Sequence, residues 1–298
     1  MVPMGQPSTA PTAPDCPPPD DDVSWDLARY FARIDYRGPT EPTLETLHGL
    51  VTAHEQHIPF ENIDPVMGFP VEALDRAALF EKMVLRQRGG YCFEQNGLMR
   101  YVLTDLGFDV DPLTGRVVWM SAAGLDSVPT ALTHHVLAVR IPGTEQRYLV
   151  DVGFGGQTPS SPLILTPDAV QQTRHEPYRL RRFGAGYALE TLIGERWQPL
   201  YTFTDEPRPM IDMQVGSWYV STHPTSMFVT GLSAAMVTDD ARWNLRGRNL
   251  SVHHADGGRT KTRFDSASQV LALLIDRFGI DVGGLGDVHA RITQVLDT

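Results

Sequence analysis

The chain has 298 residues, of which 42% are hydrophobic and 20% charged, a balance that is ordinary for a folded globular protein. Its formal net charge of −11 provides no overall basic surface for nucleic acid or an anionic membrane, and no apolar run approaches the length of a transmembrane helix. The only cysteines are Cys16 and Cys92, which excludes a disulfide framework and a cysteine-rich zinc site, and we expect a cytoplasmic protein.

Residues 1–22 differ in composition from the rest of the chain. They contain seven prolines, four aspartates and no lysine or arginine. Such a segment cannot bury enough apolar surface to offset the entropy lost on ordering, so we predict a disordered tail. Cys16 lies within it and is expected to be an exposed thiol without a role.

Apolar residues recur at helical spacing from about residue 24 to residue 106. One helix is expected through Leu27, Phe31 and Ile34, and a second through Leu44, Leu47, Val51 and His54 after a cap at Thr43. A third is expected to open at Asp75 and to end before Gly89. A fourth is expected from about Cys92 to Leu106, with Gly107 as its stop. Residues 23–110 are therefore predicted to form a helical domain.

After residue 110 the sequence changes to short segments rich in Val, Leu, Tyr and Phe, separated by turns. Strands are expected at 114–120, 134–141, 147–153, 177–183, 186–193 and 196–204, which predicts an antiparallel barrel or folded sheet over 111–211. Residues 212–298 indicate mixed structure. We expect a helix near 212–220, strands near 227–237 and 248–264 that turn at 256–258, and a helix from Ser266 to about Phe278. The predicted fold class is α+β.

One segment places a cysteine where a glycine turn meets the start of a helix. Its sequence is Arg88-Gly89-Gly90-Tyr91-Cys92-Phe93-Glu94-Gln95-Asn96. First-turn N–H groups and the positive end of the helix dipole favour a thiolate at Cys92. The glycines would let the backbone approach a substrate closely. A buried structural cysteine is the competing interpretation, because cysteine often serves as a small hydrophobic residue.

Two further segments supply a histidine and a carboxylate. Residues 133–139 alternate as a strand with His134 near its start, and residues 148–156 form a second strand that ends in Asp151 and a glycine-rich turn. Because only a short turn separates them, we predict a hairpin in which Asp151 lies across from His134 and accepts its Nδ1–H. The competing interpretations are a solvated pair of histidines and an aspartate that merely forms a turn.

Together these segments resemble the arylamine N-acetyltransferase family. Residues 58–62 (Ile-Pro-Phe-Glu-Asn) and 217–224 (Ser-Trp-Tyr-Val-Ser-Thr-His-Pro) extend the resemblance, which runs from about residue 24 to the C-terminus. It implies three domains: an N-terminal helical bundle at 23–110, a central antiparallel β-barrel at 111–211 and a C-terminal α/β lid at 212–298. It also implies a cysteine-protease-like active site between the first two, with a catalytic triad of Cys92, His134 and Asp151.

The resemblance further implies a reaction and its ligands. Acetyl-CoA would be the cosubstrate, without a metal or prosthetic group, and acetyl-Cys92 would pass the acetyl group to an arylamine or hydrazine in a ping-pong reaction of xenobiotic metabolism. By the same resemblance, the acceptor pocket is lined by Phe60, Tyr91, Val117, Phe154 and Phe228. Trp119, Gly153, Gly155 and Gly156 are similar to residues near coenzyme A.

Two alternative functions stay open at the level of sequence. An amide synthase on the same scaffold would keep the triad but close a macrolactam from a carrier-bound thioester. A catalytically silent protein would bind aromatic ligands without forming an acyl-enzyme. The doubled histidine is a further choice, because adjacent strand residues face opposite sides and only one of the two can face Cys92. We prefer His134 to His135, since it directly follows Thr133 as in the family's Thr-His pattern.

Deletion of residues 1–22 is expected to leave the melting temperature nearly unchanged, because the predicted tail contributes no packing. The measurement is thermal unfolding of the full chain and of the truncated chain under the same conditions. For a chain of this size, 1 kcal/mol corresponds to a shift of ~2–4 °C. A fall of several degrees would show that the tail packs against the domains.

Overall fold

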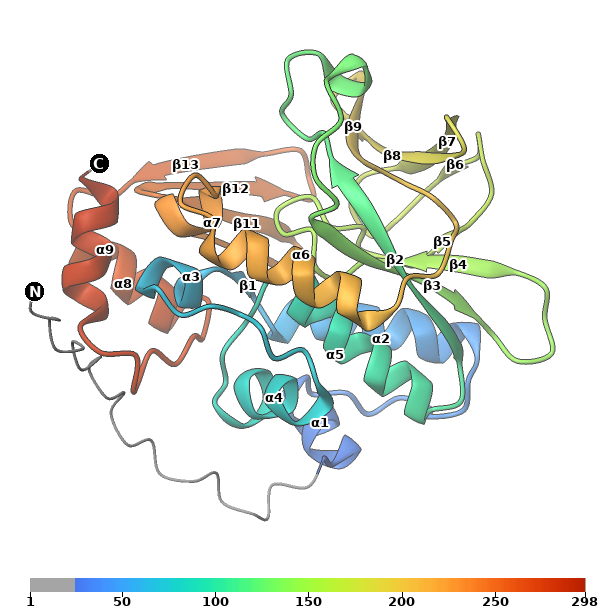
Figure 1. Cartoon of the computed structure of the whole chain (residues 1–298), viewed down its shortest axis with the longest axis horizontal. Helices are drawn as coiled ribbons and strands as arrows, with labels where there is room; N and C mark the ends of the chain where they lie inside the picture. The colour runs from blue at the N-terminus through green and yellow to red at the C-terminus, as the bar shows by residue number, and fades with distance from the viewer. Residues whose placement is uncertain (1–24, 298) are drawn as a thin grey trace, which may run out of the picture.

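The computed structural model describes residues 25–297, so the predicted tail at 1–22 and Cys16 lie outside the described residues. Helices dominate the first third of the described chain, and an eight-stranded sheet follows. Four strands of a second, five-stranded sheet, together with further helices, form the last part (Figure 1). The expected α+β class is confirmed. The boundaries of the three predicted domains stay a prediction.

The predicted helices of the first third are present with their predicted caps. They are α1 (Leu27–Arg33), α2 (Leu44–His57), α4 (Arg76–Phe80) and α5 (Cys92–Asp105). Thr43 and Asp75 accept backbone N–H groups at the starts of α2 and α4. The third helix differs from the prediction in one respect, because it continues beyond Phe80 as a π-helical turn, Glu81–Leu85. The short α3 (Ile63–Met67) was not predicted, since five residues with a proline carry little helical pattern.

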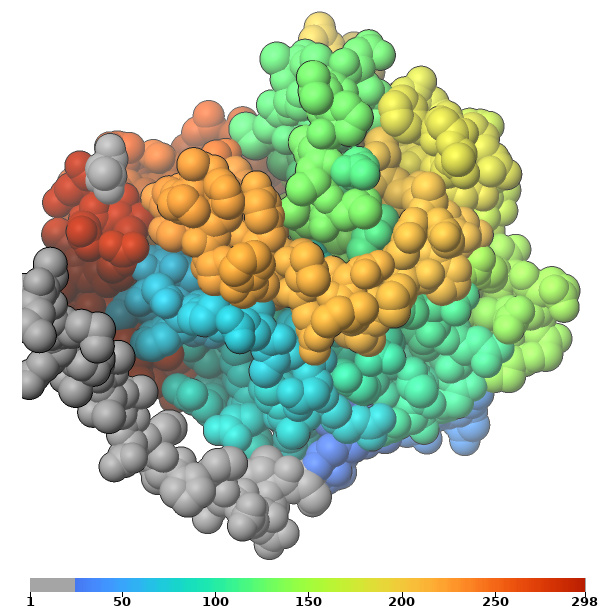
Figure 2. Space-filling model, in the orientation of Figure 1, coloured from blue at the N-terminus to red at the C-terminus, as the bar shows by residue number. Residues whose placement is uncertain are grey.

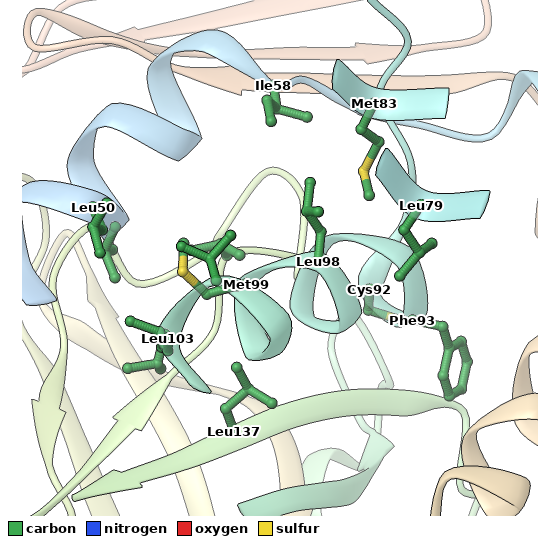
Figure 3. Packing of buried hydrophobic residues seen from close by; sticks show 14 of the residues in the cluster. Leu50, Ile58, Leu79, Met83, Cys92, Phe93, Leu98, Met99, Leu103 and Leu137 are labelled. Carbon is green, nitrogen blue, oxygen red and sulfur yellow. The ribbon is translucent and has the colours of Figure 1, made fainter. Parts of the chain in front are cut away.

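Helix α5 lies at the centre of the largest apolar core. Figure 3 shows Phe93, Leu98, Met99 and Leu103 of α5 surrounded by residues of the neighbouring elements, namely Leu50, Ile58, Leu79, Met83 and Leu137. The helix ends at Asp105, and Gly107, which follows the C-cap, has a φ of 90°, the left-handed conformation expected of a terminating glycine. Because α5 is buried along most of its length, its first residue, Cys92, is fixed relative to the surrounding elements.

The central sheet is a nearly closed antiparallel barrel of eight strands. These are β2 (Asp109–Val117), β3 (His134–Arg140), β4 (Arg147–Val150), β5 (Leu163–Ile164), β6 (Val170–Gln171), β7 (Tyr178–Phe183), β8 (Gly186–Ile193) and β9 (Arg196–Phe203). Their spatial order is β5-β4-β3-β2-β9-β8-β7-β6. The side chain of Gln171 exchanges two hydrogen bonds with the backbone of Ile164, which joins the two edge strands β5 and β6.

Strand β2 starts and ends earlier than the predicted 114–120. Its first half, including Pro112, pairs with β3. Proline has no backbone N–H to donate to a neighbouring strand. It is tolerated at this position because the strand on the other side of β2, β9, pairs with Gly115–Val117 and does not extend to Pro112. The two-residue strands β5 and β6 were not predicted, because so short a segment has no visible alternation.

The last part of the described chain supplies four of the five strands of the second sheet. Its order is β1 (Phe60–Glu61), β10 (Ser233–Val237), β11 (Ala241–Arg246), β12 (Asn249–His254) and β13 (Arg259–Arg263). Strand β1 comes from the helical part of the chain, so this sheet ties the two ends of the sequence together. Helices α8 (Ala267–Asp276) and α9 (Val288–Leu296) pack together beside the sheet, and Ser266 caps α8 as predicted.

Three features of this region differ from the prediction. The strand expected at 227–237 begins instead as a short helix, α7 (Met227–Thr230), because Ser226 caps it. Strand β11, between the strands expected near 227–237 and 248–264, was not predicted. Its Arg242 is fully buried and paired with Glu176. Helix α9 was also missed.

Helix α6 (Met210–Thr222) lies across the molecular surface between the helical part and the barrel (Figure 2). One side exposes apolar residues, among them Ile211, Val215 and Trp218. The other side is closely packed, since a side chain at Gly216 would collide with the ring of Phe93. None of the helices over residues 25–297 is long and apolar enough to cross a membrane.

Gly89→Ala is expected to destabilise the fold, because a Cβ at this position would overlap the carbonyl oxygen of Pro59. Forcing these segments apart should cost about 1–3 kcal/mol, seen as a fall in melting temperature of ~2–4 °C per kcal/mol. Gly231→Ala is the matched control, because its Cβ would meet only the Met227 oxygen at 3.4 Å. Equal melting temperatures for the two variants would contradict the prediction.

Candidate active site

Cys92 is the first residue of α5 and is 4% exposed. Its sulfur lies 3.6 Å from the carbonyl oxygen of Thr133, the residue before β3. The preceding turn is held by hydrogen bonds on both sides. The Tyr91 N–H donates to the Glu94 carboxylate at 3.1 Å, and the Gly90 carbonyl accepts the Glu61 N–H at 3.1 Å. The thiol therefore sits at the positive end of a helix whose first turn is fixed.

A network of ion pairs holds this turn in place. The Lys82 ammonium lies 2.5 Å from Glu94 and 2.6 Å from Asp64. Arg88 completes the network by pairing with both Glu61 and Asp64. Burial raises the pKa of Glu94, and Lys82 offsets part of that effect. Because removal of one member would leave a buried charge unpaired, the network fixes the path of residues 88–94.

His134 and Asp151 form a buried pair, each 2% exposed, with His134 Nε2 2.7 Å from Asp151 Oδ2. The predicted hairpin is present, since β3 and β4 pair antiparallel. The predicted bond through Nδ1 was wrong, and so was the placement of Asp151 directly across from His134. Val150 pairs with Leu137, so Asp151 follows the last ladder pair and reaches back along β3 to Nε2. Because Nε2 of His134 bonds to Asp151, the other ring nitrogen, Nδ1, makes the contact with Cys92.

The two partners shift each other's protonation. Burial lowers the pKa of His134, but the Asp151 carboxylate and Cys92 outweigh it and raise the pKa to about 10. Burial raises the pKa of Asp151, but His134, the Asn96 amide and the Gly153 N–H bring it below the ordinary value. At neutral pH the pair is therefore an imidazolium beside a carboxylate.

Asn96 is a site residue that the sequence reasoning missed. Its amide donates to the His135 carbonyl at 2.7 Å and to Asp151 Oδ1 at 2.9 Å, while its oxygen accepts the Val152 N–H at 3.0 Å. Helical periodicity could have indicated it, because residues i and i+4 of a helix share a face and Asn96 follows Cys92 by four.

Tyr201 of β9 was also missed. Its ring centroid lies 4.5 Å from that of His134 and 5.3 Å from that of Phe154, and its side chain is fully buried. No sequence signal could have indicated it, because only the adjacency of β2 and β9 in the sheet brings Tyr201 to His134.

His135 faces away from Asp151 and packs against α5. It is fully buried, and its ring is stacked on Phe93 with the centroids 6.2 Å apart. Burial lowers the pKa of His135 to about 3, so the ring is neutral at neutral pH. The geometry therefore distinguishes the doubled histidines: one is paired with a carboxylate and the other is packed in the core.

Several residues expected in the acceptor pocket meet near Cys92. Phe228 of α7 lies 5.2 Å from Tyr91 and 6.1 Å from Phe60 between ring centroids, and Phe154 lies edge-on to His134 at 5.2 Å. Val117 is farther along, at the end of β2, where it pairs with Tyr201. The Tyr91 side chain is fully buried, and its hydroxyl lies 2.8 Å from Ser217 Oγ.

The glycines leave room for the protein's own chain. Added side chains at Gly89 and Gly90 would collide with Pro59 and Glu94, and the close approach of these glycines to a substrate stays a prediction. The glycines expected near coenzyme A also have neighbours within the protein: Gly153 packs on Cys92 Cα, Gly155 on the Phe60 ring and Gly156 on Asn244. Trp119 is partly buried against the barrel core, and its backbone N–H donates to the Leu200 carbonyl.

Two further histidines of the described chain have local partners. His57 Nδ1 bonds to the Ala53 carbonyl of its own helix, and His254 lies 3.3 Å from Thr260 Oγ1. Within residues 25–297, no group of three or more His, Cys, Asp or Glu side chains could hold a metal ion.

Comparison with known proteins gives consistent matches. Residues 43–286 match a family described as N-acetyltransferase. The chain is 59% identical over 279 residues to the arylamine N-acetyltransferase of Mycolicibacterium smegmatis, covering 93% of this chain and all of that protein. The structure of Mycobacterium marinum arylamine N-acetyltransferase in complex with CoA superimposes with a TM-score of 0.87 at 53% identity, covering 91% of this chain and 99% of that one. Proansamycin X synthase of Amycolatopsis mediterranei is 35% identical over 191 residues, covering 63% of this chain and 71% of that protein.

Substitution of the two histidines is expected to separate their roles. His134→Gln should slow alkylation of Cys92 by iodoacetamide by on the order of 10³-fold, because the imidazolium partner of the thiolate is lost. His135→Gln should react nearly as fast as the original chain, provided that its melting curve shows an intact fold. Alkylation is followed by mass spectrometry of the peptide that contains Cys92. The reverse pattern in folded proteins would move the partner of Cys92 to His135.

Proposed function

This chain belongs to the arylamine N-acetyltransferase family and is an acyltransferase, and we propose that Cys92 carries its acetyl group. The proposed reaction transfers acetyl from acetyl-CoA to the amino group of an arylamine or hydrazine in two steps. The single observation that carries the proposal is the convergence of three groups: a cysteine at a helix start, an imidazole in contact with it and a carboxylate 2.7 Å behind that imidazole.

In the resting site, His134 holds the proton of the Cys92 thiol. The Asp151 carboxylate and Cys92 raise the pKa of His134 against the effect of burial, so the imidazole can hold that proton at neutral pH. The dipole of α5 adds stabilisation to the thiolate. Asp151 keeps the ring oriented through Nε2 and stabilises its positive charge, while Asn96 and the Gly153 N–H keep Asp151 ionised.

In the first step, the Cys92 thiolate attacks the thioester carbonyl of acetyl-CoA. A tetrahedral intermediate forms and its oxyanion accepts hydrogen bonds, for which the N–H of Cys92 at the helix start is suitably placed. The C–S bond to coenzyme A then breaks, and His134 donates its proton to the departing thiolate. The products are acetyl-Cys92, neutral His134 and free coenzyme A.

In the second step, the amine attacks the carbonyl of acetyl-Cys92. His134, now neutral, takes the proton of the amine as general base, within the ~10²–10⁴-fold that such catalysis contributes. The bond between carbonyl carbon and Cys92 sulfur breaks, so that the N-acetylated amine leaves and the imidazolium–thiolate pair returns. Each step moves one acetyl group and one proton.

Aromatic side chains near Cys92 support a flat aromatic acceptor. The rings of Phe60 and Phe228 lie 6.1 Å apart, and the ring of Phe154 lies beside His134. Apolar walls favour an aromatic ring and limit water, which would otherwise hydrolyse the acetylated cysteine. For coenzyme A, we propose the segment around Trp119 and the Gly153–Gly156 turn. The CoA complex of the M. marinum relative supports acetyl-CoA as the donor.

The amide synthase alternative has a relative of its own in proansamycin X synthase. That protein matches only 63% of this chain at 35% identity, whereas the M. smegmatis acetyltransferase matches 93% at 59%. The higher identity and coverage of the acetyltransferase favour acetyl transfer to free amines. No observation of the structure favours a wider cleft or a silent binding protein.

Exposure of the intact protein to acetyl-CoA without an amine is expected to add one acetyl group, carried by the peptide that contains Cys92. The measurement is mass spectrometry of the protein and of its peptides, before and after an arylamine is added. The arylamine should remove the label as its N-acetyl product appears. Cys92→Ala should take up no label, and an unlabelled original chain would overturn the proposed covalent intermediate.

A further inference from the structure

Three polar side chains from three different helices form a continuous buried relay beneath the Cys92 turn. They are Tyr30 of α1, His54 of α2 and Gln95 of α5, and all three are fully buried. The Tyr30 hydroxyl lies 2.9 Å from His54 Nδ1, and His54 Nε2 lies 2.6 Å from Gln95 Oε1. None of the three belongs to the catalytic group proposed above.

The orientation of the Gln95 amide is fixed by its surroundings. Its nitrogen faces three backbone carbonyl oxygens, those of Pro59 at 2.8 Å, Gly90 at 3.2 Å and Ile58 at 3.4 Å. Carbonyl oxygens only accept hydrogen bonds, so the opposite orientation would place an amide oxygen against three other oxygens. The amide therefore donates from its nitrogen to the carbonyls and presents its oxygen to His54.

The direction of the remaining bonds follows from that orientation. Gln95 Oε1 needs a donor, so His54 carries its proton on Nε2. In a neutral ring, Nδ1 is then an acceptor, and the Tyr30 hydroxyl donates to it. Burial lowers the pKa of His54 to about 4, which keeps the ring neutral in the range where the enzyme would work. Every donor in the relay thus has an acceptor.

The relay ends where the backbone before Cys92 contacts the backbone before Phe60. Gly90 lies two residues before Cys92, and its N–H also bonds to the Pro59 carbonyl at 3.3 Å. Phe60, which follows Pro59, forms an isolated bridge with Gly90. The Gln95 nitrogen therefore joins the backbone that leads into Cys92 to the backbone that carries Phe60.

We infer that His54 is a positioning residue for the nucleophile: through Gln95 it sets the place of Cys92 relative to both His134 and Phe60. This inference rests on the proposed role of Cys92. Without the His54 N–H, the buried Gln95 oxygen has no donor, so the amide is free to rotate and its hold on the two carbonyls is lost. A displacement of Cys92 by about 1 Å is enough to cost ~10²-fold in rate.

The test compares His54→Leu with His54→Gln in the full chain. Leucine removes the donor, whereas glutamine can place an amide N–H close to the position of Nε2. We expect His54→Leu to lose about 10- to 100-fold in the rate of Cys92 alkylation by iodoacetamide and in kcat for arylamine acetylation. KM for the arylamine should change much less. His54→Gln should recover most of both rates, which a merely structural role would not predict.

His57→Leu is the matched control, because His57 lies on the same helix but its ring bonds to the Ala53 carbonyl rather than to Gln95. It should alkylate and acetylate like the original chain. Alkylation is measured on the Cys92 peptide across a range of pH, and melting curves accompany each variant. If His54→Leu does not fold, Tyr30→Phe takes its place. It removes one hydroxyl from the relay and should slow both rates several-fold.

Two results would overturn the inference. One is a folded His54→Leu variant with unchanged alkylation and acetylation, and the other is an unchanged Tyr30→Phe variant where His54→Leu fails to fold. Failure of the proposed function would look different. In that case acetyl-CoA would not label Cys92 of the original chain at all, while alkylation by iodoacetamide would still report on the relay.

Discussion

The start of α5 is joined to three separate parts of the chain within a few residues of Cys92. Backbone hydrogen bonds tie Gly90 to Pro59 and Glu61, and Gly153 packs so closely on Cys92 Cα that no side chain fits between them. Thr133, the residue before β3, contacts the sulfur itself. A reactive thiol at a helix start can act only if the groups around it are also held in position. These contacts fix the start of α5, the segment before β3 and the turn at Gly153 relative to one another.

Burial of charge is the second constraint, and it is met by pairing. His134 and Asp151 compensate each other, as do the groups of the network formed by Glu61, Asp64, Lys82, Arg88 and Glu94. A buried ion pair adds little net stability, because desolvation of both charges offsets their attraction. Its value in this fold is geometric, since each group has few positions in which its charge is compensated. His135 shows the contrast: it lacks a carboxylate partner and is kept neutral.

The same reasoning applies to the neutral relay of Tyr30, His54 and Gln95. Its hydrogen bonds have only one consistent direction, because the three carbonyls that surround the Gln95 nitrogen cannot donate. Charged groups hold the turn before Cys92 on the Glu94 side and neutral groups hold it on the Gln95 side. These two residues are adjacent in α5 and point to different faces of the helix, as helical geometry requires. The motif around Cys92 therefore combines the nucleophile with the two side chains that anchor its backbone.

The sequence by itself determined the class of the fold, the helices with clear caps and the segments that meet at the site. Thr43, Asp75 and Ser266 marked helix starts because capping is a local interaction between a side chain and the next turn. Short elements such as α3 and β5 carried too little periodicity to be predicted.

Tertiary structure alone decided which ring nitrogen of His134 meets Asp151, because strand register is set by pairing over the whole sheet. It also brought Tyr201 to His134 and Tyr30 to His54. Such pairs are distant in sequence, and their contacts arise only when strands and helices pack together.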